Sequence, residues 1–250
     1  MNTLEYFSSR RTIRKYDQTR EISPNLIDKM LEQAARAANT GNMQTYSVIV
    51  TTNKDKIEKL APAHYNQPAI ANAKAVLTFC LDFNRFNHWC RINDTIPGLD
   101  NLQGFTWGII DTSLFAQQFC TIAEMSGLGT CYLGTTTYNA ELIAQTLGLP
   151  TEVVPVITVT IGYPAESPRL QERLPISTII HHGHYNKLTD EQLRECYAEK
   201  ESLPTSQQFV KENGKANLAQ VFAEVRYPRA ANEQFSSVYK EFLKKQGIEL

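Results

Sequence analysis

Hydrophobic residues are patterned along four stretches of the chain in ways that predict buried structure. The segment KAVLTFCLD, which ends at Asp82, and the run Val153–Tyr163 are strand-sized and rich in apolar and β-branched residues, so each predicts a buried strand. Tyr46–Thr52 predicts a further strand of the same kind. Phe105–Ser126 carries apolar residues nearly all round a helix, which is typical of a central, buried helix, and Gly127 suits the position after its end.

Helix start and stop signals frame the N-terminal part of the chain. Ser23 followed by Pro24 predicts the start of a helix, because serine is a preferred N-cap and proline is tolerated in the first turn. Its apolar spacing predicts an end near Asn39–Asn42, where Gly41 can adopt a left-handed conformation. A second, short helix is expected at Lys54–Leu60, followed by a loop.

The C-terminal part of the chain is expected to be mostly helical. Asn139 is expected to begin a short helix that ends at Gly148, and Thr189 with Gln192 fits a capping box for a helix at Asp190–Lys200. Two further helices are expected at Lys215–Val225 and Ala231–Gln246.

The stretch Asn84–Gly104 has no regular pattern and predicts a long irregular loop, which in a compact domain is usually functional or mobile. No repeats and no low-complexity tract interrupt the chain. The order of helices and strands predicts an α+β fold, in which helices pack around a small mixed β-sheet.

Composition narrows the class of protein. The chain has 250 residues, 42% of them apolar, and a net charge of −1, so no global field attracts it to nucleic acid or to an anionic membrane. No apolar run approaches the roughly 20 residues of a membrane helix, and the first residues do not resemble a secretory signal. Five cysteines without a CxxC pair, with Cys80 and Cys120 inside apolar segments, predict reduced thiols and a cytoplasmic protein.

Two arginine-bearing segments are candidates for phosphate binding. They are RRTIRKY at Arg10–Tyr16 and RLQERLP at Arg169–Pro175. A guanidinium group presents a fixed fork of donors that suits phosphate, so two such segments brought together would hold a phosphorylated cofactor. The alternative is two unrelated, solvated basic patches, and neither segment alone decides between these interpretations.

Two further segments have residues that suit a flat polar ligand. NTGNMQ at Asn39–Gln44 offers amides that both donate and accept, which match a ring edge such as that of a flavin, although the same residues are common where a helix ends. GLGTCYLGTTT at Gly127–Thr137 is rich in small residues that allow a close approach of the backbone to a ligand. It follows a helix and lacks a third glycine at the right spacing, which excludes a dinucleotide-binding Rossmann motif.

Other catalytic signatures are weak or missing. HHGH at His181–His184 could bind a metal, but no cysteine or carboxylate stands at a suitable spacing, so no metal is expected. The sequence contains neither a GxSxG nucleophile context nor a Walker loop.

Taken together, these segments resemble the nitroreductase family of FMN-dependent oxidoreductases, in particular its NADPH-dependent flavin- and nitro-reducing branch. RRTIRKY is similar to the family's RxSIRxF, and NQPAIANAKAVLTFCLDFNRF to its NQxxIxxAxxxLxFCaD. DTSLFAQQFCTIAEMSGLGTCYLG is similar to DxxLxAQNxxxAAESLGLGxxYxG, and LGLPTEVVPVITVTIGYPA, followed by RLPISTIIH, to LxLPxxVxPxxxxxxGxPA. Five motifs in the family's order carry the resemblance.

The resemblance implies an intertwined homodimer with two FMN molecules at the subunit interface. Residues 1–185 would form the FMN-binding domain, and residues 186–250 would form its C-terminal helical extension. The implied cofactor-binding residues are Arg10, Arg11, Thr12, Arg14, Asn39, Thr40, Asn42, Gln44, Gln67, Tyr132, Leu133, Gly134, Thr135, Gln171 and Arg173. Those of the first segment and Arg173 would hold the phosphate, the ribityl chain and one ring edge. Those of Asn39–Gln44 would approach the ring from the partner subunit.

Two departures from the family pattern affect this expectation. The family usually has Lys-Pro-Arg before the Leu-Pro pair, whereas this chain has Gln171-Glu172-Arg173, which removes a cation and adds an acid. The family's Gly-Gly pair is Gly134-Thr135 here, and we expect the larger residue to narrow the surroundings of the ring.

The resemblance also implies the chemistry. Reduced nicotinamide (NADPH or NADH) would pass hydride to the flavin, and a nitroaromatic, quinone or flavin acceptor would then replace it in a ping-pong cycle. No side chain is expected to be an obligatory acid or base, so no catalytic residue is assigned. Arg226 and Arg229 are candidates for the extra phosphate of NADPH, with exposed helix-end arginines as the alternative. A flavin-binding protein without turnover, a specialised flavin-processing or dehalogenating relative, and a structural dimer without cofactor remain other possibilities.

Overall fold

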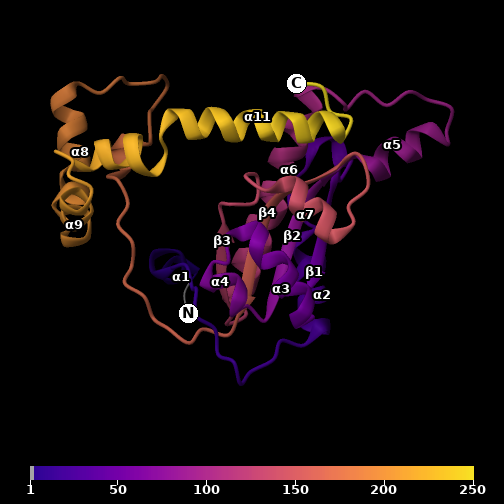
Figure 1. The fold of residues 1–250 in the computed structure, drawn as a ribbon, viewed down its shortest axis with the longest axis horizontal. Coiled ribbons are helices and arrows are strands. Elements are labelled where there is room, and N and C mark those ends of the chain that lie inside the picture. The colour runs from indigo at the N-terminus through magenta and orange to yellow at the C-terminus, as the bar shows by residue number, and fades with distance from the viewer. Residues whose placement is uncertain (1–2) are drawn as a thin grey trace. The chain divides into compact units, whose positions relative to one another are not determined.

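The structure is a computed structural model that describes residues 3–250 (Figure 1). Packing divides the chain into two compact units. The first comprises the residues up to Arg169 together with Ser237–Leu250, and the second comprises Leu170–Ser236. The division at residues 185 and 186 that the sequence suggests remains a prediction about function, because compactness alone does not define where a cofactor binds.

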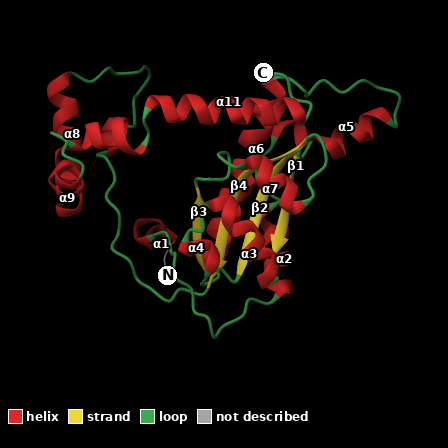
Figure 2. Ribbon diagram, viewed as in Figure 1, coloured by secondary structure: helices red, strands yellow, loops and turns green. Residues whose placement is uncertain are grey.

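A four-stranded sheet forms the centre of the first unit (Figure 2). Its strands in the order β1-β2-β4-β3 are β1 Tyr46–Thr51, β2 Ala75–Asp82, β4 Val153–Gly162 and β3 Gly129–Leu133. All three ladders are antiparallel, so the α+β class is confirmed but the expectation of a mixed sheet is wrong for the strands of this chain. The strand β3 was not expected, because its glycines were interpreted as part of a segment that lines a ligand; Thr130 and Tyr132 favour a strand, and the segment pairs with β4.

Helices cover both faces of this sheet. On one face, α6 Leu102–Met125 packs against the strands and α2 Pro24–Ala34 packs against α6. The other face is covered by α3 Lys54–Leu60, the short 3-10 turn η2 Ala61–His64, α4 Pro68–Ala71 and α7 Ala140–Leu147. Alternate residues of β2 contribute to the two cores, since Leu77 and Phe79 join the α6 side and Val76 joins the α7 side. This double coverage explains the continuous apolar run of β2.

The second unit is helical. It contains the 3-10 turn η3 Ile176–Thr178, α8 Asp190–Ser202, α9 Pro204–Glu212, α10 Leu218–Gln220 and the π-helical turn η4 Val221–Arg226. The capping box at the start of α8 is confirmed, with Thr189 and Gln192 each accepting a backbone N–H from the other. The last helix, α11 Arg229–Lys245, begins in this unit and ends in the first, where Phe242 and Leu243 are buried.

Several predicted boundaries differ from the structure. The helix after Ser23 ends at Ala34, before the separate 3-10 turn η1 Thr40–Asn42 that contains Gly41. The predicted loop after Asp82 begins instead with the helix α5 Phe83–Arg91. Its N-cap is the Asp82 carboxylate, which accepts the backbone N–H of Arg85 at 3.1 Å. The remaining helices are α1 Thr3–Ser9 and, in place of one helix at Lys215–Val225, the pair α10 and η4.

The long helix α6 is buried on one side only. Phe115 and Phe119 lie in the core, whereas Trp107, Ile110 and Leu114 are exposed in the single chain. The expectation of a helix buried all round is therefore wrong for the monomer. The exposed positions follow helical spacing and form one stripe, the α6 apolar stripe.

The cysteines match the expectation of free thiols. All five are unpaired, and four of them are buried. Burial raises the pKa of the Cys80 and Cys120 thiols well above its usual range, so both stay protonated and unreactive. None of the helices within residues 3–250 combines the length and the hydropathy that a bilayer crossing requires.

Candidate functional site

The N-terminal arginine segment is fastened to the edge of the sheet. The backbone N–H of Ile13 donates to the carbonyl of Thr130 on β3 at 3.0 Å, and the hydroxyl of Tyr16 lies 2.7 Å from that of Thr160 on β4. Two glycines make room for it. A Cβ at Gly129 would lie 2.5 Å from Ile13, and one at Gly162 would lie 2.6 Å from Tyr16. The segment can lie on the strands only because both positions lack a side chain.

Arg10 is held by a buried carboxylate. Its Nε and Nη2 atoms lie 3.2 and 3.0 Å from the two carboxylate oxygens of Glu124, whose side chain is only 8% exposed. The hydroxyl of Tyr6 donates to the same carboxylate at 2.7 Å, and that of Thr130 also donates to it. Burial opposes the charge on Arg10, but Glu124 outweighs it and raises the pKa of the guanidinium. Arg10 is therefore a fixed, permanently charged donor.

The other residues of the segment are held less tightly. Arg11 donates from Nη1 to the carbonyl of Pro168 at 2.9 Å. Thr12 is half-buried, and Arg14 is exposed. The Glu166 carboxylate accepts the backbone N–H of Arg14 at 2.7 Å, so the backbone of this residue is fixed independently of its side chain. Arg10 and Arg11 both line a pocket of about 430 Å³ beside Gly129, and neither Thr12 nor Arg14 contributes to it.

The amide segment Asn39–Gln44 has an unusual backbone. Gly41, Asn42 and Gln44 have φ values of 55°, 55° and 53°, in the left-handed region that glycine and asparagine adopt most readily and that strains the backbone of Gln44. The side chains partly hold one another, since the Gln44 backbone N–H donates to the Asn39 side-chain oxygen at 3.2 Å. Strained backbone of this kind is often found at ligand-binding sites, where the surrounding structure enforces it.

Two charged residues outside the segment hold it in place. Asp111 on α6 is almost fully buried and accepts the backbone N–H of Thr40 at 2.9 Å and its hydroxyl at 3.0 Å. Arg85 on α5 donates to the carbonyls of Gln44 and Tyr46. Asp111, Arg85 and Glu124 were not predicted as site residues from the sequence. Asp111 and Glu124 both lie in the segment DTSLFAQQFCTIAEMSGLGTCYLG, and its similarity to a family motif with acidic residues at these positions was the available signal.

Gln67 and the segment Gly134–Thr135 are linked through a buried histidine. Gln67 is the N-cap residue of α4 and is partly exposed. Three residues before it, His64 has no exposed surface, and its Nδ1 lies 2.9 Å from the hydroxyl oxygen of Thr135. Next to His64, the carbonyl of Ala63 accepts the side-chain amide of Asn139 at 2.8 Å. These two contacts join the segment before Gln67 to the loop that follows β3.

The four predicted residues at the end of β3 point in different directions. Tyr132 is partly buried, with its hydroxyl 3.4 Å from the Gln117 side-chain oxygen. Leu133 is buried in the core on the α7 side, so only its backbone is available to a ligand. At Gly134, no atom outside this residue and its two chain neighbours lies within 4 Å of the position that a Cβ would take. Thr135 is 9% exposed and faces His64, so its side chain does not narrow the space next to Gly134 as expected.

The second arginine segment lies in the second unit except for Arg169, the last residue of the first unit before the division. Arg173 is exposed, and its Nη1 donates to the carbonyls of Gln171 and Glu172, at 3.3 and 2.9 Å. The acid that departs from the family pattern, Glu172, forms an ion pair of 3.2 Å with Lys200 on α8. Its negative charge is therefore balanced within the second unit. The convergence of Gln171 and Arg173 with the first segment remains a prediction.

Other candidates of the sequence analysis have local partners. Arg226 stacks on Phe209, with the guanidinium carbon 4.4 Å from the ring centroid, and Arg229 donates to Glu233 at 2.7 Å. The Nδ1 atom of His181 accepts a backbone N–H at 3.3 Å. Across residues 3–250, His, Cys, Asp and Glu side chains form no group of three or more that could hold a metal ion.

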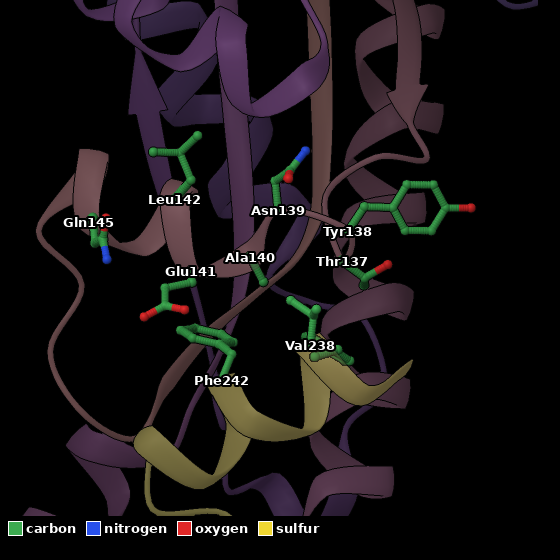
Figure 3. Close-up of a pocket in the computed structure, with 10 residues that line it drawn as sticks. Thr137, Tyr138, Asn139, Ala140, Glu141, Leu142, Gln145, Val238 and Phe242 are labelled. Atoms are coloured by element: carbon green, nitrogen blue, oxygen red, sulfur yellow. The ribbon is translucent and has the colours of Figure 1, made fainter. Parts of the chain in front are cut away.

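A separate pocket of about 300 Å³ lies between α7 and α11 (Figure 3). Glu141 and Gln145 come from α7, and Val238 and Phe242 face them from α11. None of the cofactor-binding residues that the sequence predicts lines this pocket. Its lining contains both polar and apolar residues, and we assign this pocket no role in the site described above.

Comparison with known proteins decides the family. Residues 7–163 match the model of the nitroreductase family, which is more than half of the chain. This protein belongs to the nitroreductase family. A crystal structure of a protein from Bacteroides fragilis NCTC 9343, provisionally named an oxidoreductase, is 49% identical, covers 98% of this chain and 100% of its own, and superposes with a TM-score of 0.95.

Curated relatives of this nitroreductase-family protein carry functional names. An oxygen-insensitive NADPH nitroreductase of Salmonella typhimurium is 32% identical over 78% of this chain and 82% of its own length. An FMN reductase (NADPH) of Bacillus subtilis is 29% identical over 76% of this chain and 77% of its own. The family match includes the predicted site residues from Arg10 to Thr135 and ends before Gln171 and Arg173.

Proposed function

We propose that this nitroreductase-family protein is an FMN-dependent NAD(P)H oxidoreductase. It takes hydride from reduced nicotinamide and passes electrons to nitroaromatic, quinone or flavin acceptors in a ping-pong cycle. The names of the relatives support the cofactor and the electron donor. The observation that carries the proposal is the ion pair of Arg10 with Glu124. It fixes the Arg10 side chain beside the edge of the sheet and keeps the guanidinium group charged.

The residues present suit FMN. Its phosphate needs fixed cationic donors, and Arg10 and Arg11 line one pocket in the first unit. A flat ring needs a wall without side chains, and the free space next to Gly134 meets that need. The polar edge of the ring needs amide partners, which Asn39, Asn42 and Gln67 can supply. Arg173 from the second unit is proposed as a further phosphate ligand.

When bound, FMN supplies the hydride chemistry, and the protein binds and orients it. Arg14 is proposed to face the polar ring edge, where a fixed positive charge favours the negative charge of the reduced ring. Thr12 and Gln171 are proposed to add polar contacts to the ribityl and phosphate groups. No acid or base of the chain is required for this role.

The α6 apolar stripe supports a homodimer. Trp107, Ile110 and Leu114 expose a contiguous apolar surface on the helix that also carries Asp111, the anchor of the amide segment. Surfaces of this kind usually become buried by a partner. In the proposed dimer, Asn39–Gln44 of each chain reaches the flavin of the other, and FMN lies at the interface. Together with the unpaired thiols, the proposal favours a cytoplasmic enzyme.

The experiment is an anaerobic titration of the purified protein, loaded with FMN. A yellow preparation that NADPH or NADH bleaches and that a quinone re-oxidises supports the proposal. Flavin that is bound but not bleached by either donor indicates a binding or flavin-processing protein instead. A colourless protein that cannot be loaded with FMN contradicts the proposal. Initial rates with both donors over a panel of acceptors then define the preferred pair.

A further inference from the structure

Thr135 stands where the family pattern has a second glycine, and the structure gives it a specific partner. Its hydroxyl oxygen lies 2.9 Å from Nδ1 of His64, and both residues are buried. At the neighbouring position, a Cβ on Gly134 would meet no residue other than its two chain neighbours within 4 Å. The larger side chain is therefore turned toward His64 and into the protein.

His64 occupies an unusual place for a polar side chain. Its neighbours Leu60, Ala61 and Ala63 belong to the apolar core on the α7 side. The other ring nitrogen, Nε2, is buried and has no hydrogen-bond partner among the described residues. An aliphatic residue would fill such a site without leaving a polar atom unpaired, so the contact with Thr135 is the interaction that distinguishes a histidine here.

The histidine also lies between two parts of the proposed flavin site. The backbone N–H of Gln67 donates to the carbonyl of His64 at 3.2 Å, which ties the ring-edge candidate to the histidine. The Asn139 contact to Ala63 forms a second link to the same loop. A shift of His64 would therefore move Gln67 and Thr135 together.

We propose that His64 is a positioning residue of the flavin site. It holds the backbone of Gly134–Thr135 through the Thr135 hydroxyl, and it thereby fixes the position of this segment relative to Gln67. The inference rests on the proposed function. On this proposal, His64 and Thr135 depend on each other. The buried Thr135 hydroxyl needs a hydrogen-bond partner, which His64 supplies, whereas a glycine at this position would need none.

The test compares variants from both sides of the contact. Thr135→Val removes the hydroxyl at nearly constant shape, and Thr135→Ser keeps it. His64→Leu removes the polar partner, whereas His64→Asn keeps a polar atom close to the position of Nδ1. Ile143→Val, which removes a methylene from the same core at a residue that is not itself a proposed ligand, is the control for general destabilisation. Apoprotein of each is titrated with FMN, and the absorption spectrum of the bound flavin is recorded.

Thr135→Val and His64→Leu should each raise the FMN dissociation constant about tenfold and change the flavin spectrum in the same way, as loss of one hydrogen bond in a binding site predicts. The double variant should bind no worse than either single one, because both remove the same contact. Thr135→Ser and His64→Asn should remain within about threefold of the parent, and Ile143→Val should lower the melting temperature of the apoprotein without changing the dissociation constant.

Other results would overturn the inference. If Thr135→Val binds FMN like the parent with an unchanged spectrum, or if the effects of the two single variants add in the double variant, His64 has no positioning role through Thr135. Failure of the parent itself to bind FMN would be a different result, and it would overturn the proposed function on which the inference rests.

Discussion

The two compact units hold their candidate ligands in different ways. In the first unit, Arg10 is fixed by Glu124, the amide segment by Asp111, and Thr135 by His64, and each of these partners is buried and distant in sequence. In the second unit, the Arg173 guanidinium contacts the carbonyls of the two residues before it. The candidate ligands of the first unit are therefore fixed before any cofactor binds. The second unit carries a cation whose geometry depends on short-range contacts, and we expect a bound phosphate to order it.

The largest expected effect distinguishes the more buried ion pair of Arg10 and Glu124 from the pair of Lys200 and Glu172, whose side chains are 33% and 20% exposed. Glu124→Gln leaves Arg10 partly buried beside a neutral partner, and the loss of such a pair should cost about 3 kcal/mol of unfolding free energy. Glu172→Gln, which breaks the pair with Lys200 in the second unit, should cost less than about 1 kcal/mol. Urea unfolding of both variants measures the difference, and equal losses would remove the contrast between the units.

The next effect depends on pH. Burial lowers the pKa of His64 to about 4, below the roughly 6.5 of an unfolded histidine, so the unfolded chain binds the proton first. Stability therefore falls as the pH drops from above 6.5 toward 4, by about 2 kcal/mol between pH 7 and pH 5 from this residue alone. Unfolding free energies across this range should show a shallower slope in His64→Asn than in the parent. Parallel slopes would show that His64 does not titrate as described.

The second unit is tested through FMN retention. Arg173→Ala should weaken FMN binding about tenfold, because a charge-assisted contact to phosphate is lost, and Arg169→Ala should have a smaller effect. Neither change should alter the stability of the apoprotein appreciably, since both side chains are exposed. Dissociation constants that are the same for both variants and the parent would remove Arg173 from the phosphate site.

The smallest effect concerns local structure in the second unit. Thr189→Ala removes the capping box of α8 and should cost about 1 kcal/mol. Amide hydrogen exchange should show faster exchange in the first turn of α8 and unchanged protection in β2. A loss of protection in β2 of similar size would mean that the two units unfold together.

Local signals in the sequence predicted much of the fold. The helix α3 matches its predicted bounds, the runs of β2 and β4 are strands, and Gly127 and Gly148 follow their helices with positive φ. These features depend on neighbouring residues, on capping and on apolar periodicity. The helix α5 was missed although Phe83, Phe86 and Cys90 follow helical spacing and Asp82 was an available N-cap signal.

The supporting residues of the site were harder to predict. Arg10 and Glu124 are separated by more than a hundred residues. Local sequence patterns do not detect pairs that are so far apart in the chain. Asp111 and Glu124 resemble ordinary polar positions of a long helix, and a lone histidine such as His64 gives no signal in sequence. The side chains expected to touch the cofactor were named through the family resemblance, whereas the buried partners that hold them depend on tertiary contacts.

The central claim is that separated cationic side chains meet around one FMN phosphate, and a crystal structure of the FMN-loaded dimer tests it most directly. We expect the phosphate to lie between the segment of Arg10 and Arg14 on one side and Arg173 on the other. A loaded structure in which Arg10 and Arg173 lie on opposite outer surfaces and face bulk water would contradict it.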